Sequence, residues 1–237
     1  MKLFNYYVII LLLGMGCSPN RTEKELASNK TITDVFDKSE IKELAMIVDF
    51  FNAQICDAQK GEKTTITQCY QHFFNWMKAC ELSGNYDSIP YHVSYQEQQK
   101  MYSQLSEDVF DQIWRIDQRW YHDALDTTDT VEVIDITYNG KYLKFLKEFG
   151  KENGLIEEYA DEFEQVGEIG PVGSSMVLNE YQLFDVNDIR FQLFIAMHYL
   201  TLNDAMEVRK QFKPNTSYMN YHVETLPKSV KEFKKKG

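Results

Sequence analysis

IRFQLFIAMHYLTL, residues 189–202, is apolar nearly all round when it is drawn as a helix. A helix of this kind is buried on several sides rather than along one stripe. Its 14 residues are too few to cross a bilayer, which takes about 20. We therefore expect the segment near 186–202 to be the central helix of a core, with the other elements packed around it.

Two helices with well-marked starts form a predicted antiparallel hairpin in the first third of the chain. Asp37 and Glu40 make one capping box, and Thr65 and Gln68 make a second. After each start, apolar side chains recur three or four residues apart, which places them on one helical face. These residues are Ile41, Leu44, Val48, Phe51 and Ile55 in the first helix and Ile66, Cys69, Phe73, Trp76 or Met77, and Cys80 in the second.

The rest of the chain also predicts helices, which gives a single all-α domain of about seven helices over residues 34–226. A third helix starts at Ser94, restarts at Ser106 and continues along a stripe that reaches Trp114 and Trp120. Residues 131–137 alternate weakly, as a strand does. Because one strand cannot make a sheet, we interpret them as an extended connection. Residues 227–237, PKSVKEFKKKG, form a basic C-terminal tail.

Three of the four cysteines lie in the predicted hairpin. Cys69 and Cys80 share one helix and lie about 16 Å apart along its axis, beyond the ~7 Å limit for bridged Cα atoms. In a hairpin that turns near residues 61–63, residues whose numbers sum to about 125 face each other. Cys56 and Cys69 meet this condition, so we predict a disulfide between them and a buried thiol at Cys80. The alternative is three reduced cysteines that act as small apolar residues.

Composition limits the classes of partner. Of the 237 residues, 43% are hydrophobic and 14% aromatic, and the formal net charge is −11. The apolar content is too high for a disordered chain. The negative charge opposes binding to nucleic acid and to anionic lipid headgroups. We therefore expect no nucleic-acid partner.

The chain begins MKLFNYYVIILLLGMGC. Lys2, the apolar run 3–13 and the small residues before Cys17 have the layout of a signal peptide, residues 1–16. Residues 13–17 resemble the lipobox of bacterial lipoproteins. This resemblance covers residues 1–17 only and implies cleavage before Cys17 and a lipid on its thiol. The alternative is an ordinary signal peptide in which Cys17 is an incidental thiol.

The lipoprotein resemblance implies a membrane partner and a location. A lipid on Cys17 would anchor the protein to a membrane of the bacterial cell envelope. In lipoproteins similar to this one, Asp directly after the cysteine retains the protein at the inner membrane. Ser18 stands there instead, which points to the outer membrane. Residues 18–33 are polar and lack periodicity, so residues 17–33 are predicted to be a flexible, lipidated tether.

The spacings that mark common catalytic and metal sites are missing. The chain contains no G-x-S-x-G, H-E-x-x-H, C-x-x-C or G-x-x-x-x-G-K-[ST]. No two of the five histidines lie three or four residues apart, and we expect His198 to be a hydrogen-bonded core residue. Asp123, Asp126 and Asp129 lack the spacing of a calcium loop, which indicates a solvated loop. We predict no cofactor and no metal site.

Two segments are candidates for a partner surface. Trp120, Tyr121 and His122 combine aromatic faces with polar edges, which suits a sugar or a peptide. Gly170 and Pro171 belong to the glycine-rich stretch 167–175, where a loop is expected. The alternatives are aromatic side chains that pack inward at a helix end and a simple connection.

These observations favour a lipid-anchored cell-envelope protein that binds a protein or glycan without catalysis, in an assembly, inhibitory or immunity role. The alternative is an envelope hydrolase that acts on cell-wall or polysaccharide material. Such an enzyme needs two carboxyl groups ~5–9.5 Å apart in one cleft. Acidic residues are so numerous that the sequence does not single out a pair.

Overall fold

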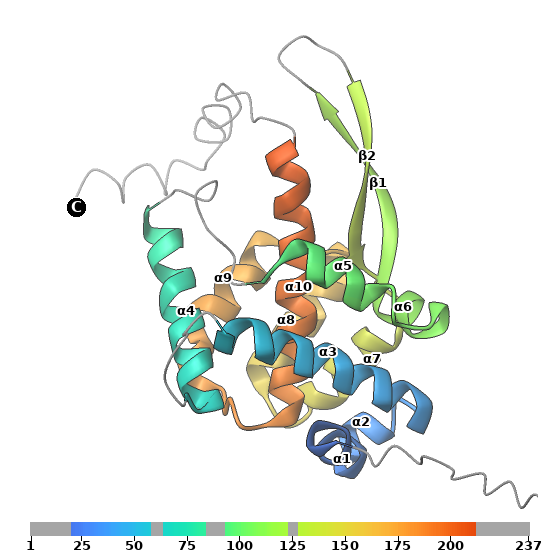
Figure 1. Cartoon of the computed structure of the whole chain (residues 1–237), viewed down its shortest axis with the longest axis vertical. Helices are drawn as coiled ribbons and strands as arrows, with labels where there is room; N and C mark the ends of the chain where they lie inside the picture. The colour runs from blue at the N-terminus through green and yellow to red at the C-terminus, as the bar shows by residue number, and fades with distance from the viewer. Residues whose placement is uncertain (1–19, 58–63, 84–92, 123–127, 212–237) are drawn as a thin grey trace, which may run out of the picture.

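A long helix, α10 (Ile189–Gln211), runs through the middle of the molecule (Figure 1). Every residue from Phe191 to Thr201 is buried. Phe194 is 0% exposed and meets the Tyr159 ring edge to face, with the ring centroids 4.9 Å apart. The predicted central helix is therefore confirmed, and it continues beyond residue 202.

The computed structural model describes residues 20–57, 64–83, 93–122 and 128–211. Residues 1–16, Cys17 and the tail 227–237 lie outside these ranges. The described elements other than α10 are α1 (Arg21–Ser28), α2 (Lys30–Thr33), α3 (Lys38–Asp57), α4 (Ile66–Ser83), α5 (Tyr95–Tyr102), α6 (Glu107–Ile113), β1 (Trp114–His122), β2 (Thr128–Ile136), α7 (Lys141–Gly150), α8 (Gly154–Val166), α9 (Pro171–Glu180) and the 3-10 helix η2 (Tyr181–Leu183).

These elements form one predominantly α-helical body around a single core cluster. The predicted all-α domain is confirmed, with ten α-helices in the described residues rather than about seven. In the same residues, no helix is both long and apolar enough to cross a membrane.

Both predicted capping boxes are present. The backbone N–H of Glu40 donates to Asp37 Oδ1 at 3.0 Å, and the N–H of Asp37 donates to Glu40 Oε2 at 2.7 Å. Thr65 and Gln68 exchange the same pair of bonds before α4. Glu40 is only 8% exposed and also accepts two bonds of 2.6 Å from Lys141 Nζ. The first carboxylate of α3 therefore also fixes the start of α7.

The disulfide between Cys56 and Cys69 joins α3 to α4, as predicted. The Cα atoms are 5.0 Å apart, within the range of bridged cysteines. Away from the bridge the two helices diverge, and the C-terminal end of α4 stands at the edge of the body (Figure 1). Cys80 remains a thiol, but it is half-buried, so the expected full burial is wrong. Burial still raises the pKa of this thiol.

Non-reducing peptide mapping of protein purified without reductant should recover a linked Cys56–Cys69 peptide. A closed loop of this length, 13 residues, stabilises by about 3 kcal/mol in the chain-entropy account. Reduction should therefore lower the midpoint of urea denaturation. A Cys80→Ser variant is the matched control and should keep both the linked peptide and the midpoint. A linked Cys56–Cys80 peptide would contradict the structure.

Residues 114–136 form a β-hairpin where we expected a helix and a lone extended segment. β1 pairs antiparallel with β2 from Trp114 opposite Ile136 to His122 opposite Thr128. The predicted helical stripe is therefore wrong beyond Ile113, where α6 ends. Residues 114–117, WRID, alternate between apolar and polar, which fits a strand once a second strand supplies the partner.

The base of the hairpin is fixed to the core and the rest projects from the body (Figure 1). Val133 and Asp135 of β2 are buried, and β2 packs against α10. The indole Nε1 of the buried Trp114 donates to Thr201 Oγ1 of α10 at 2.9 Å. Two residues further along the same face of β1, Ile116 is 63% exposed. The hairpin is therefore packed at its base and exposed further along its strands.

The predicted flexible tether over residues 17–33 is wrong from residue 20 onward, because α1 and α2 belong to the folded body. Leu26 and Ile32 are both 0% exposed, and α1 packs against α3. Asn20 caps α1 by accepting the N–H of Glu23 at 2.8 Å. Two buried apolar residues are too few to produce a visible hydrophobic period, so the apolar pattern does not reveal these helices.

Candidate functional site

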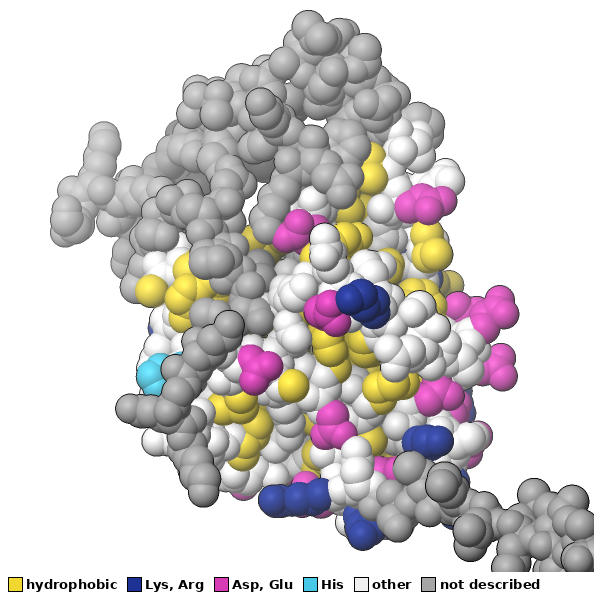
Figure 2. Space-filling model, viewed as in Figure 1, with side chains coloured by type: hydrophobic (Ala, Val, Ile, Leu, Met, Phe, Trp, Pro, Cys, Tyr) yellow, Lys and Arg dark blue, Asp and Glu magenta, His cyan; other side chains and the backbone are white. Residues whose placement is uncertain are grey.

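A groove of about 1050 Å³ lies between α1, α3 and α5. Its apolar lining consists of Met46 and Phe50, one turn apart on α3, and Met101 on α5. Met46 and Phe50 are half-buried and Met101 is buried. Figure 2 shows this face of the molecule, where apolar patches lie between charged side chains. The groove therefore has an apolar floor that a partner can reach.

Charged side chains of both signs form the rim of the groove. They are Glu23 on α1, Lys42, Glu43 and Asp49 on α3, and Glu97 and Lys100 on α5. Lys100 Nζ donates to Glu97 Oε1 at 2.6 Å, across one turn of α5. With four acidic and two basic side chains, the rim is acidic overall but offers both signs to a partner.

The rim carboxylates also hold the groove together. Asp49 accepts bonds from Asn20 Nδ2 and Thr22 Oγ1, which fixes the start of α1 against α3. Glu43 Oε2 accepts the backbone N–H of Ser106 at 2.7 Å and its hydroxyl at 3.0 Å. Because α3 supplies both carboxylates, it fixes the positions of the chain segments on either side of the groove.

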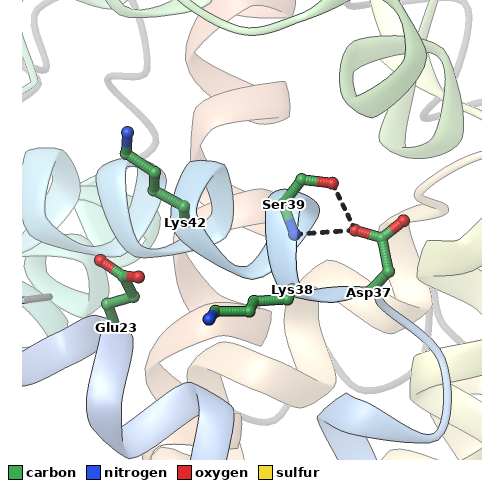
Figure 3. A pocket seen from close by; sticks show the side chains of 5 residues that line it. All are labelled: Glu23, Asp37, Lys38, Ser39 and Lys42. Carbon is green, nitrogen blue, oxygen red and sulfur yellow. Dashed lines mark hydrogen bonds between the residues drawn. The ribbon is translucent and has the colours of Figure 1, made fainter. Parts of the chain in front are cut away.

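A smaller hollow of about 540 Å³ extends the groove past the start of α3. Figure 3 shows Glu23 on α1 beside Lys38 and Lys42 on α3, with Asp37 and Ser39 at the helix start. Ser39 donates its N–H at 2.8 Å and its hydroxyl at 2.6 Å to Asp37 Oδ1. These bonds, followed by the one from the Glu40 N–H, lower the pKa of the Asp37 carboxyl. Asp37 is therefore a structural cap, while Glu23, Lys38 and Lys42 face the hollow.

The described lining of the groove holds no serine or cysteine nucleophile beside a base. Its described lining includes no histidine and no cysteine, and its one serine, Ser39, donates to a helix cap. A serine or cysteine nucleophile needs an adjacent base to be activated. In the described ranges, no three side chains of the metal-binding types come together. What the groove offers is an apolar floor with charged edges.

A second chemically unusual place is the buried carboxyl group of Asp204, between α5 and α10. Tyr102 OH and Gln98 Nε2 donate to its Oδ2, and Gln99 Nε2 donates to its Oδ1 at 2.9 Å. Burial raises the pKa of Asp204 to about 7, although these hydrogen bonds act to lower it. Asp204 is 2% exposed, so α5 and α10 cover it and it lines no open cleft.

Asp204 should make the stability of the fold depend on pH. An ordinary Asp has a pKa near 3.9, so between about pH 4 and pH 7 the folded state binds a proton that the unfolded state does not. Stability should therefore fall as the pH rises through this window. Each unit of pKa difference corresponds to about 1.4 kcal/mol. Urea denaturation should show this loss in the wild type and not in Asp204→Asn.

Asp111→Asn, which removes an exposed carboxylate, is the control and should follow the wild-type pH profile. Burial lowers the pKa of His198 to about 3, which gives the opposite pH dependence. Because all three proteins contain His198, its effect cancels in the comparison. Parallel profiles for the wild type and Asp204→Asn would rule out a buried, protonated Asp204.

The predicted partner-surface residues do not come together. Trp120, Tyr121 and His122 end β1, with Trp120 six residues along the strand from the buried Trp114, or roughly 20 Å. Gly170 and Pro171 lie at the junction of α8 and α9 instead of in a long loop. The expectation that Trp120 to His122 end a helix is wrong, because this segment pairs as a strand.

The loop in the glycine-rich segment is shorter than expected, because Pro171 already starts α9. Proline suits the first helical position, where its missing N–H is not needed. Gly167, with φ of 79°, ends α8 in the left-handed conformation that glycine adopts readily. Gly170 is buried, and a Cβ there would lie 2.8 Å from Glu162 Oε1. Gly170 therefore permits close packing and presents no open surface.

His198 is a core residue, as predicted. It is 0% exposed, and its Nδ1 lies 2.9 Å from the Tyr159 hydroxyl. Its lowered pKa keeps the ring neutral at physiological pH. Asp123 and Asp126 fall outside the described residues, and Asp129 belongs to β2.

No protein-family model, curated protein or solved structure matches this chain. The groove was not predicted from the sequence, because its parts come from three separate segments. One local signal was present. Asn20 and Glu23 have the capping spacing that marks the other helices, and recognising it would have predicted the start of α1, although not its packing on α3.

Proposed function

We propose that this protein is a lipid-anchored protein of the bacterial cell envelope that binds another macromolecule without catalysing a reaction. An assembly, inhibitory or immunity role fits such a protein. The observation that carries the proposal is the α1–α3–α5 groove, which begins at Asn20, three residues after Cys17. The groove combines an apolar floor with charged edges, and its described lining holds no serine or cysteine nucleophile beside a base.

The anchor in this proposal is a lipid on the Cys17 thiol, as the lipobox resemblance implies. Ser18 after the cysteine favours the outer membrane. Acyl chains stabilise membrane attachment by about 0.8 kcal/mol for each buried CH₂ group, so more than one chain makes release slow. The net charge of −11 would not by itself hold the protein to anionic lipid.

The partner we propose for the groove is a segment of another protein. Methionine side chains adapt to apolar groups of varied shape, and two of the three floor residues are methionines. Charged rims of both signs can pair with either charge on a peptide. A glycan partner would instead favour several open aromatic faces, and Phe50 is the one aromatic residue in the described lining.

We do not advance the hydrolase as a second candidate, because no described contact favours it. The carboxyl group whose pKa is raised to about 7, Asp204, is 2% exposed. A glycosidase acid needs a cleft that admits a sugar.

Replacing the Cys17 thiol tests the anchor. In cells that process lipoproteins, Cys17→Ser should abolish acylation and move the protein from the membrane fraction to the soluble fraction or leave it unprocessed. Intact-mass measurement of the wild type should find a lipid on Cys17. Cys80→Ser is the control, because it removes another thiol and should leave acylation unchanged. Wild type without a lipid, together with membrane retention of Cys17→Ser, would contradict the proposal.

Site-specific photo-cross-linking in living cells tests the groove. A photoreactive residue in place of Lys42, on the rim, should give a discrete cross-linked protein band. The same residue in place of Lys144, an exposed lysine on α7 away from the groove, should not. Met46→Glu should weaken the Lys42 band, because it places a charge on the apolar floor. Equal cross-linking at both lysines would show that the groove is not the contact.

A further inference from the structure

We infer that the protein stands on the membrane with α1 and α2 against the lipid headgroups and its β-hairpin directed away from them. The inference rests on the proposed lipid on Cys17, and it adds which surface of the folded body meets the bilayer. It follows from the way α1 is fixed, from the length of chain between α1 and Cys17, and from the charges at this end.

The start of α1 is a fixed part of the body. Asn20 Nδ2 donates to Asp49 Oδ2 at 2.6 Å, and the Thr22 hydroxyl donates to the other oxygen of the same carboxylate. Leu26, one turn further on, is 0% exposed. The anchored chain therefore enters the folded body at Asn20. A flexible tether over residues 17–33 would instead have let the body rotate freely relative to the membrane.

The connection from the lipid to this fixed point is very short. Ser18 and Pro19 are the residues between Cys17 and Asn20. Consecutive Cα atoms lie about 3.8 Å apart, so Cys17 can be no more than about 11 Å from Asn20. That distance is close to the diameter of one helix with its side chains, about 10–12 Å. A lipid on Cys17 in the bilayer therefore brings α1 to the headgroup layer.

The charges at this end suit a headgroup surface better than those of the remaining chain. Residues 20–42 contain five basic side chains, Arg21, Lys24, Lys30, Lys38 and Lys42, and five acidic ones, Glu23, Glu25, Asp34, Asp37 and Glu40. These charges balance, so this segment carries no net charge. Lys and Arg side chains gather at this end in Figure 2. In a chain of net charge −11, this is an end that anionic headgroups do not repel.

Two of these lysines are available for headgroups. Among the described residues, Lys24 and Lys38 are exposed and form no ion pair, whereas Arg21 and Lys30 pair with acids on their own helices. Lys42 belongs to the rim of the groove instead. Lysine side chains can bury their apolar stems at an interface while the ammonium group reaches the headgroups.

The β-hairpin lies at the other end of the body. Figure 1 shows α1 and α2 at the bottom of the view and the hairpin at the top. Each strand has nine residues, or about 30 Å of extended chain. With α1 at the membrane, the hairpin projects into the aqueous space, and the groove opens at the side of the body next to the bilayer.

Headgroup quenching on the full, lipidated chain tests this orientation. A Cys80→Ser background allows a single environment-insensitive fluorophore to be attached at Lys24→Cys on α1 or, as the matched control, at Gln118→Cys, an exposed position of the hairpin. Each labelled protein is reconstituted into vesicles of phosphatidylethanolamine and phosphatidylglycerol that contain a lipid with a quencher on its headgroup. Fluorescence should be lost at position 24 and retained at position 118.

The outcomes separate this inference from the proposed function. If mass measurement finds no lipid on Cys17 and the protein does not sediment with vesicles, the proposed anchoring fails. If the protein is acylated and sediments but the two positions are quenched equally, or position 118 more strongly, the anchoring stands and the orientation is wrong. Lys38→Cys provides a second label at the same end and should be quenched as strongly as Lys24→Cys.

Discussion

The burial of α10 on all sides is the constraint on which the other elements depend. Side chains from Phe191 to Thr201 point in every direction around the helix axis, so each needs a cover. α3, α5 and the hairpin pack against different parts of it. Rings from other segments also pack on α10: Phe73 of α4 meets Tyr199 edge to face at 4.8 Å, and Phe184, just after η2, stacks on Phe191 at 4.4 Å. Removing apolar surface from water on this scale is what makes a chain of short helices hold one shape.

Polar groups inside this core determine how the covering elements are aligned. The Gln98 amide donates to the Leu200 carbonyl at 2.9 Å and to Asp204, and Asn203 donates to the Gln98 side-chain oxygen at 2.8 Å. A buried polar group that loses its partner costs free energy, so α5 has one favourable position along α10. Trp114 bonded to Thr201 does the same for the start of the hairpin. Apolar burial brings the elements together, and these hydrogen bonds determine where α5 and the hairpin lie along α10.

The same logic applies at the N-terminal end, where the proposed function lies. The Asp49 carboxylate accepts hydrogen bonds from Asn20 and Thr22, which hold α1 against α3. The groove lies between these two helices and α5. An anchor so close to a fixed helix would orient the body as well as hold it. Binding of a partner near a membrane is helped by such orientation, because less rotational freedom is lost when the partner docks.

Local signals in the sequence determined much of this fold. The capping pairs Asp37 with Glu40 and Thr65 with Gln68 fixed two helix starts, because side-chain oxygens and orphan N–H groups three residues apart need no distant partner. The largely apolar run at 189–202 indicated the central helix. The positions of Cys56 and Cys69 on either side of the turn between two helices indicated the disulfide. Tertiary structure alone decided the hairpin, the place of α1 and the groove. Residues 114–122 follow either a helix or a strand period until 128–136 pairs with them. α1 has one buried apolar side chain, Leu26, whose cover comes from elsewhere in the chain. The groove needs α1, α3 and α5 side by side, and that proximity is set by long-range packing that no local spacing encodes.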